Sequence, residues 1–275
     1  MGSAFRAFLQ GVVAALLSVS LPAGSALAAC GGMAFGPQTA PSPYFIRAAA
    51  GPAGAVPPGI LRIRYVGHAT FDIESPQGAI IQTDYNDYVR SERIPHIITM
   101  NNAHDSHFSY APDKRILHVL RGWDPAGGVA RHNIVFRDVR VRNVPTNFVE
   151  GPGGHLSNGN SMFVIEAVGL CVVHISHLHH YLSKDQIREL GIIDVALAPI
   201  DGMWTMSHDE LFRVLADIRP RLIIPMHYGS GQGVAEFVAR AEAKWKVRQS
   251  DSDTIDVSLR TMPEKPEVVF LQGGY

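Results

Sequence analysis

The chain has 275 residues, enough for one large domain or two small ones, and its 46% hydrophobic and 18% charged residues can build a substantial core. Lys and Arg number 24 against 25 Asp and Glu, which gives a formal net charge of -1. No excess of positive charge exists to attract a nucleic acid or an anionic membrane surface. The composition indicates a globular catalytic or binding domain, with a small molecule as its expected partner and no nucleic acid.

Residues 1–29 are predicted to be an export signal that takes no part in the fold. Arg6 is their only charged residue, and the apolar run at 7–21 is broken by Pro22 and Gly24 too soon for a membrane-spanning helix. Leu27-Ala28-Ala29-Cys30 resembles the lipobox of bacterial lipoproteins. That resemblance implies lipidation of Cys30 and anchoring on the periplasmic side of the cell envelope. The alternative is a plain signal cut after Ala26-Leu27-Ala28, which predicts a secreted or periplasmic protein.

The two cysteines are expected to stay unpaired. If Cys30 is lipidated, Cys171 has no partner, and its apolar surroundings are typical of a buried, inert thiol. Residues 30–59 are rich in Pro, Gly and Ala, which predicts a flexible tether. Residues 60–275 show no internal linker and are predicted to form one domain.

The regular part of the chain begins with strands and then alternates strands with helices. Alternating apolar and polar residues predict an antiparallel meander at 61–65, 70–74 and 79–83. Further strands are expected at 97–100, 133–136, 139–144, 162–166, 170–175, 193–199 and 222–225. Ser183 with Gln186 and Ser207 with Glu210 form capping boxes that begin two helices, and a third helix is expected at 234–245. This order predicts an α/β sandwich with helices covering the sheets.

The histidines are grouped after predicted strands. All 13 lie after residue 67, and the groups at 102–107, 174–180 and 225–229 each follow a short apolar strand. A lone histidine is more often structural or exposed, but imidazoles at three strand ends can converge on one cation. Neutral imidazole is a preferred ligand of zinc and other transition metals. The sequence therefore predicts a metal centre.

Several motifs carry a resemblance to a known family. In chain order they are Gly67-His68-Ala69-Thr70-Phe71, Gln82-Thr83-Asp84 and the segments 159–166, 174–182, 194–202 and 224–229. Their order and spacing resemble the lactonase-like hydrolase branch of the metallo-β-lactamase superfamily. The resemblance covers about residues 60–230 and implies an αββα metallo-β-lactamase sandwich with its metal site at one edge.

The family's first ligand motif is only partly present. Its His-x-His-x-Asp-His pattern falls on Asn102, His104, Ser106 and His107, so the first histidine and the aspartate are missing. Asp105 lies beside the missing aspartate and is a candidate carboxylate ligand or base after a shift of the loop.

The later ligands are also altered. The aspartate that bridges two metals in the family falls on His177, while the final histidine is retained as His227. The histidine between the two halves of the family pattern is either His155 or is replaced by Asn147. The resemblance thus implies the candidate metal ligands His104, His107, His155, His177 and His227.

These substitutions bear on the number of metal ions. Two zinc ions bring four positive charges together, and Ser106 and His177 remove the carboxylates that would offset them. One ion is therefore expected rather than two, with zinc first and another divalent transition metal as the alternative. Three neutral histidines and a water make a workable catalytic zinc site.

Other residues are assigned supporting roles. We expect His107, His177 and Asp105 to take part in catalysis. His68, Asp84 and Asn102 are expected to orient the ligands, as groups behind metal-bound histidines do. For Asp84 an ordinary turn residue is the alternative.

Two functions follow from this pattern. The first is a metal-dependent hydrolase of the cell envelope that acts on an ester, a lactone or a phosphodiester. The second is a catalytically silent metal-binding or sensing protein that keeps the fold without the hydrolytic carboxylates.

Overall fold

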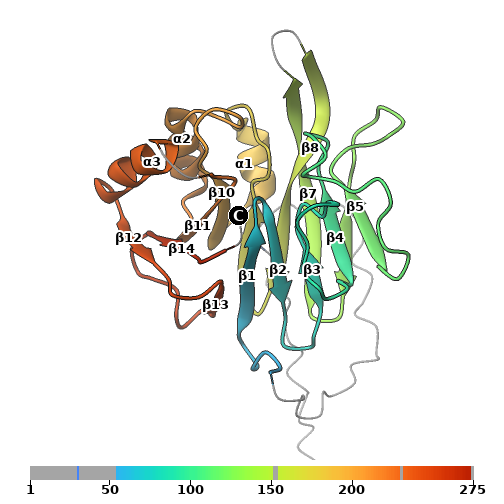
Figure 1. Cartoon of the computed structure of the whole chain (residues 1–275), viewed down its shortest axis with the longest axis horizontal. Helices are drawn as coiled ribbons and strands as arrows, with labels where there is room; N and C mark the ends of the chain where they lie inside the picture. The colour runs from blue at the N-terminus through green and yellow to red at the C-terminus, as the bar shows by residue number, and fades with distance from the viewer. Residues whose placement is uncertain (1–29, 31–53, 151–153, 230–231, 274–275) are drawn as a thin grey trace, which may run out of the picture.

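A computed structural model describes Cys30 and residues 54–150, 154–229 and 232–273. In these residues two sheets face each other, and the helices gather beside the second sheet (Figure 1). In spatial order the first sheet contains β13 (Thr254–Val257), β1 (Leu61–Gly67), β2 (Thr70–Glu74), β3 (Ile80–Gln82), β4 (Ile97–Met100) and β5 (His118–Arg121). The second contains β12 (Lys246–Gln249), β14 (Glu267–Phe270), β11 (Leu222–Met226), β10 (Val195–Pro199), β9 (Leu170–His174), β8 (Gly154–Ala167), β7 (Val139–Glu150) and β6 (Asn133–Phe136). This is the predicted α/β sandwich.

The first sheet begins as the meander that the sequence predicts. β1 pairs antiparallel with β2, and β2 pairs antiparallel with β3. Alternate residues of β1 are buried and face the second sheet, as the apolar–polar alternation requires. β4 and β5 then join in parallel, so that β3, β4 and β5 all end at the same edge.

The second sheet changes from antiparallel to parallel along its width. β6, β7, β8 and β9 form antiparallel pairs, whereas β9, β10 and β11 are parallel to one another. The strands β9, β10 and β11 are buried along their whole length, as parallel strands covered on both faces are. Their connections are α1 (Lys184–Leu190) and α2 (His208–Ile218), and α3 (Gln232–Glu242) follows β11.

Both predicted capping boxes are present. Ser183 accepts from the backbone N–H of Gln186 at the start of α1, and Ser207 does the same with Glu210 at the start of α2. In each box the side chain of the third helical residue, Gln186 or Glu210, accepts from the backbone N–H of the capping serine. These local bonds fix where each helix begins after its strand.

Two apolar cores hold the layers together. One lies between the sheets, with Phe71 and Phe163 among its fully buried side chains. The other lies between the second sheet and the helices, with Leu211 and Phe237 at its centre. Burial of one such side chain contributes roughly 1.5–3 kcal/mol, so both cores stabilise the sandwich. Over the outer face of the first sheet, loop residues such as Phe108 and Trp123 pack on Ile98 and Met100 where no described helix lies.

The β7–β8 hairpin is longer than predicted. The sequence pattern indicates strands only at 139–144 and 162–166, but pairing continues outward to Glu150 and Gly154. The register shifts between Thr146 and Phe148, where an irregularity interrupts the ladder. Polar and glycine residues hide this extension from the sequence pattern, because pairing is a property of two segments together.

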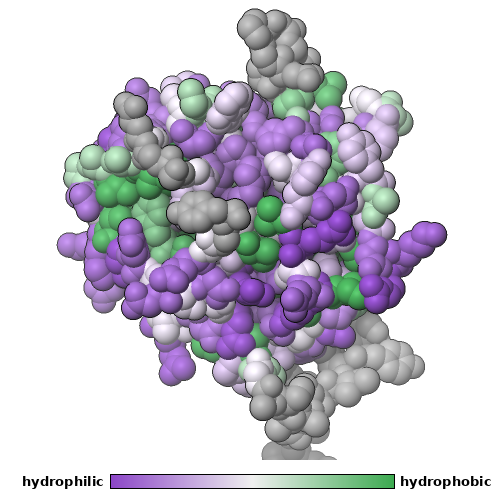
Figure 2. Space-filling model, viewed as in Figure 1, coloured by the Kyte–Doolittle hydropathy of each residue, from purple (hydrophilic) through white to green (hydrophobic). Residues whose placement is uncertain are grey.

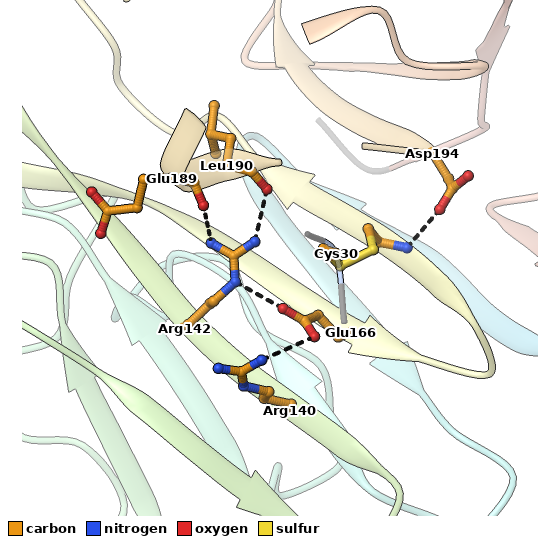
Figure 3. The surroundings of a disulfide bond; sticks show 8 residues. Cys30, Arg140, Arg142, Glu166, Glu189, Leu190 and Asp194 are labelled. Atoms are coloured by element: carbon orange, nitrogen blue, oxygen red, sulfur yellow. Dashed lines mark hydrogen bonds and ion pairs between the residues drawn. A yellow bond between two sulfur atoms is a disulfide. The ribbon is translucent and has the colours of Figure 1, made fainter. Parts of the chain in front are cut away.

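The pairing of the cysteines corrects the prediction. Cys30 and Cys171 form a disulfide across 141 residues of sequence, and Cys30 is buried in the core beside the helices (Figure 3). The carbonyl oxygen of Cys30 also accepts from the backbone N–H of Ile192. The predictions of an inert, unpaired Cys171 and of no disulfide are therefore wrong. A sulfur in a disulfide cannot carry a thioether-linked lipid, so this bond is also incompatible with lipidation at Cys30.

Cys30 was expected at the start of a tether, and the structure places it within the fold instead. The predicted export signal at 1–29 and most of the predicted tether lie outside the described residues. Among the residues that are described, no helix has the length and apolar character needed to cross a membrane. Polar residues cover most of the face seen in Figure 2, and apolar ones form small separate groups.

A buried ion pair lies near the disulfide. Arg142 donates to Glu166 at 2.8 Å, and its two terminal nitrogens donate to the carbonyl oxygens of Glu189 and Leu190, each also at 2.8 Å (Figure 3). These carbonyls belong to the last turn of α1, where no helical partner remains for them. Arg142 thus joins β7 and β8 to the end of α1.

Candidate metal centre

Four histidines from three separate segments meet at one edge of the sandwich. His104 and His107 lie in the loop after β4, His177 follows β9 and His227 follows β11. One ring nitrogen of each lies within 4.8 Å of those of the other three. His107, His177 and His227 are buried, while His104 is exposed and leaves one side of the group open to solvent.

The strands bring these residues together because parallel strands end at the same edge of a sheet. The backbone then turns sharply just beyond four of the strands. His68, Asp84, Ser176 and His227 all have φ between +40° and +56°, in the left-handed region that residues with a Cβ rarely adopt. Such backbone strain is concentrated at functional sites, where the surrounding structure holds it in place.

The ring nitrogens that face the centre have no partner within the described structure. Nε2 of His107, of His177 and of His227 is buried and makes no hydrogen bond there. An unsatisfied buried polar atom costs about 1–3 kcal/mol. Three such atoms aimed at one point therefore fit a bound cation, and the imidazole-only donor set suits zinc or another divalent transition metal.

Asp84 holds His107 from behind. Its Oδ2 lies 2.6 Å from His107 Nδ1, and both side chains are fully buried. Ser176 Oγ donates to the same oxygen at 2.9 Å, and Asn101 Nδ2 donates to Oδ1 at 3.2 Å. Burial raises the pKa of Asp84, and the nearby His174 together with these hydrogen bonds opposes the rise. A carboxylate in this position fixes the ring so that Nε2 faces the centre.

The other ligands have partners of different kinds. His177 Nδ1 lies 2.6 Å from His179 Nε2, and His104 Nδ1 is hydrogen-bonded to Ser106 Oγ at 2.8 Å. Nδ1 of His227 lies 3.7 Å from Asp201 Oδ2. Each of the four rings therefore has its Nδ1 beside another polar group of the chain.

His68 borders the centre without belonging to the group of four. Its ring centroid is 4.4 Å from that of His227 and 5.0 Å from that of His107. Its carbonyl oxygen accepts from the backbone N–H of His227 at 2.7 Å, which links the ends of β1 and β11. Its Nδ1 is buried without a hydrogen-bond partner in the described part of the chain.

The environment keeps these imidazoles neutral. Burial, together with the neighbouring His227, lowers the pKa of His68 to about 4. Burial is also the main cause that lowers the pKa of His104, His107, His177 and His227. A neutral imidazole keeps a lone pair, which is the form that binds a metal at neutral pH.

Two predicted site residues lie apart from the group, and the side chain of a third is not described. Asp105 is exposed, and its carboxylate accepts from Tyr88 Oη at 2.7 Å. Asn102 is partly buried and its backbone N–H donates to Asn160. His155 lies on β8 opposite Val149, and its side chain is outside what the structure describes.

The alternative to His155 at the middle position was Asn147. Its side-chain oxygen accepts from the backbone N–H of Asn158, within the β7–β8 hairpin. Its backbone N–H donates to His180 Nε2 at 3.0 Å.

Sequence reasoning missed several residues that touch the ligands. Asn101, rather than its neighbour Asn102, reaches Asp84, and Ser176, His179 and Asp201 were not singled out as ligand supports. All lie inside or beside the motifs that carry the family resemblance. Only their places immediately after strands could have indicated a role.

Comparison with known proteins agrees with the sandwich fold. Residues 62–227, more than half of the chain, match the family model described as the beta-lactamase superfamily domain. A UPF0173 metal-dependent hydrolase of Nanoarchaeum equitans is 27% identical over 215 residues, which cover 67% of this chain and 93% of that protein.

Solved structures share the fold. A protein of Thermotoga maritima, provisionally named a Zn-dependent hydrolase of the metallo-beta-lactamase superfamily, superposes with a TM-score of 0.57 at 24% identity, over 78% of this chain and all of that one. Igni18, a metallo hydrolase of Ignicoccus hospitalis, gives a TM-score of 0.53 at 17% identity, over 73% of this chain and 99% of its own. With the family match and the sandwich in agreement, this chain belongs to the beta-lactamase superfamily and has the metallo-β-lactamase fold.

Proposed function

We propose that the protein is a metal-dependent hydrolase that binds one divalent cation through His104, His107, His177 and His227 and cleaves a small-molecule ester, lactone or phosphodiester. The observation that carries this proposal is the convergence of three buried, unpartnered Nε2 atoms with a ring nitrogen of His104. The names of the relatives, as metal-dependent hydrolases, support the reaction class. A bound zinc ion supplies Lewis acidity, which activates water and polarises a carbonyl or phosphoryl oxygen.

The charges around the site favour one cation over two. The group of four contains no carboxylate, and Asp84 lies behind His107 with its oxygens engaged by His107, Ser176 and Asn101. Two divalent ions about 3.5–4 Å apart would repel each other with little negative charge between them. Zinc is the proposed ion because neutral imidazole is among its preferred ligands, and because zinc can take a fifth ligand, which leaves room for a water beside four histidines.

The open side of the centre is where a substrate would enter. His104 is exposed, whereas the other three rings are buried. The buried rings exclude water from behind the site, so the reacting groups approach past His104. Neutral His107 and His177 hold the cation by their lone pairs, and Asp84 keeps the His107 proton on Nδ1.

Metal analysis and a substrate screen test the proposal together. We expect one zinc per chain, and turnover of an ester, lactone or phosphodiester that is lost in His227→Ala. His118→Ala is the matched control, because His118 lies on β5 with its ring against Phe136. Two ions per chain would contradict the single-cation centre. One ion with no turnover of any class would favour a silent metal-binding protein, and no ion at all would overturn the metal site.

We also propose that the protein is exported and that its signal is cleaved after Ala28 without lipidation. The apolar segment after Arg6 supports export, and the Cys30–Cys171 disulfide is typical of an oxidising compartment such as the periplasm. Intact-mass analysis of protein recovered from a Gram-negative host should give a chain that begins at Ala29 with one disulfide. A diacylglyceryl adduct on Cys30 would contradict this proposal.

A further inference from the structure

The contact between His177 and His179 contains one proton, and the structure indicates which ring carries it. His177 Nδ1 and His179 Nε2 are 2.6 Å apart, with ring centroids separated by 4.6 Å. One of these nitrogens must donate and the other accept, because two lone pairs or two N–H groups would repel. The direction of this bond decides whether His177 Nε2 carries a proton or a lone pair.

The burial of His177 supplies the answer. Its Nε2 is buried with no hydrogen-bond partner in the described structure and belongs to the converging group of four. If Nδ1 were the acceptor, Nε2 would carry a buried N–H with no acceptor within hydrogen-bonding distance, which is costly. The opposite tautomer leaves a lone pair there, which a cation can use, so His177 Nδ1 donates to His179 Nε2.

We propose that His179 is a positioning residue that holds His177 as its Nδ1–H tautomer, with His177 Nδ1 donating to His179 Nε2. The tautomer is a property of the metal-free protein, whereas its purpose, to aim the His177 Nε2 lone pair at a cation, rests on the proposed function. His107 is held by a carboxylate and His177 by a neutral imidazole, so two ligands use the same geometry with different charge behind them.

Nitrogen NMR tests the tautomer without any metal. In protein labelled with ¹⁵N-histidine and stripped of metal, long-range ¹H–¹⁵N spectra at neutral pH should show His177 with its proton on Nδ1. His179→Leu, which has no acceptor, should abolish that preference. His179→Gln can accept through its side-chain oxygen and should retain it. His180→Leu is the neighbouring control, because His180 binds the backbone of Asn147 and Tyr181 and should not affect His177.

Zinc affinity tests whether the Nδ1–H tautomer of His177 serves to bind a cation. His179→Leu should bind zinc roughly 10–100-fold more weakly, as expected for loss of a partner behind a metal ligand, with His179→Gln and His180→Leu close to wild type. A proton on His177 Nε2 in the wild-type protein, or unchanged affinity in His179→Leu, would overturn this inference. A wild-type protein that has the Nδ1–H tautomer but binds no zinc would overturn the proposed metal centre and leave the hydrogen-bond chain standing.

Discussion

Asp84 Oδ2 and His107 Nδ1 lie 2.6 Å apart in a pocket where neither side chain is exposed to solvent. The contact joins the turn after β3 to the loop after β4, two parallel neighbours whose ends share one edge. It keeps the His107 proton on Nδ1 and leaves Nε2 facing the other histidines. The left-handed backbone of Asp84, at φ +40°, is consistent with a role for this buried acid behind a proposed metal ligand.

Asp84→Asn should weaken zinc binding by roughly 10–100-fold, because the amide preserves the shape of the carboxylate but not its charge. Competition with a chromophoric chelator measures the change. Asp256→Asn is the control, since Asp256 forms an exposed ion pair with Arg62 on the β1–β13 edge. Equal affinity in Asp84→Asn and wild type would show that the carboxylate does not support the ligand.

Gly122→Ala should disturb the same network from a distance. A Cβ at Gly122 would lie 2.1 Å from Asn101 Oδ1 and 3.0 Å from the backbone nitrogen of Ser161. Asn101 must move, and its hydrogen bond to Asp84 is lost. We expect the free energy of unfolding to fall by about 1–3 kcal/mol, the usual cost of overpacking, together with weaker zinc binding.

Gly229→Ala is the matched control for that change, because a Cβ there meets no atom within 4 Å. Urea denaturation should place it within about 0.5 kcal/mol of wild type. If both alanine variants behaved alike, the close approach of Gly122 to Asn101 would not be the cause.

Removal of the disulfide should destabilise the chain. Cys30 and Cys171 close a loop of 141 residues, so Cys30→Ala is expected to lower the free energy of unfolding by roughly 2–4 kcal/mol. The double variant Cys30→Ala/Cys171→Ala should match the reduced wild-type protein in urea denaturation, apart from small packing differences. Two free thiols by mass analysis in unreduced, exported protein would contradict the pairing.

Arg142→Leu should cost far more than loss of a surface ion pair. It leaves Glu166, 2% exposed, with only Arg140 at 3.4 Å, and it removes both donors to the last turn of α1. The free energy of unfolding is expected to fall by about 3–5 kcal/mol, the usual cost of breaking a buried ion pair. Arg64→Leu, which removes the exposed pair with Asp253, should cost about 1 kcal/mol or less. Comparable losses in urea denaturation for the two variants would show that burial of the Arg142 pair is not decisive.

Much of the fold follows from contacts between residues close together in the sequence, and it was therefore predictable from the sequence. The alternation in β1 indicates which of its residues are buried, and Ser183 and Ser207 mark where two helices begin, because the capping bonds join residues a few positions apart. The grouping of histidines after strands also indicated which segments come together at one edge, because side chains leave the sheet at strand ends.

Tertiary structure decided the rest, because the decisive contacts join residues far apart along the chain. Asn101 rather than Asn102 reaches Asp84, Asp105 turns outward to Tyr88, and Cys30 meets Cys171 instead of remaining free for a lipid. Each outcome depends on the direction of a side chain after a bend or on the packing of two distant segments. The residue types alone determined that imidazoles would be available at the strand ends, and the packed strands determined which nitrogens face one another.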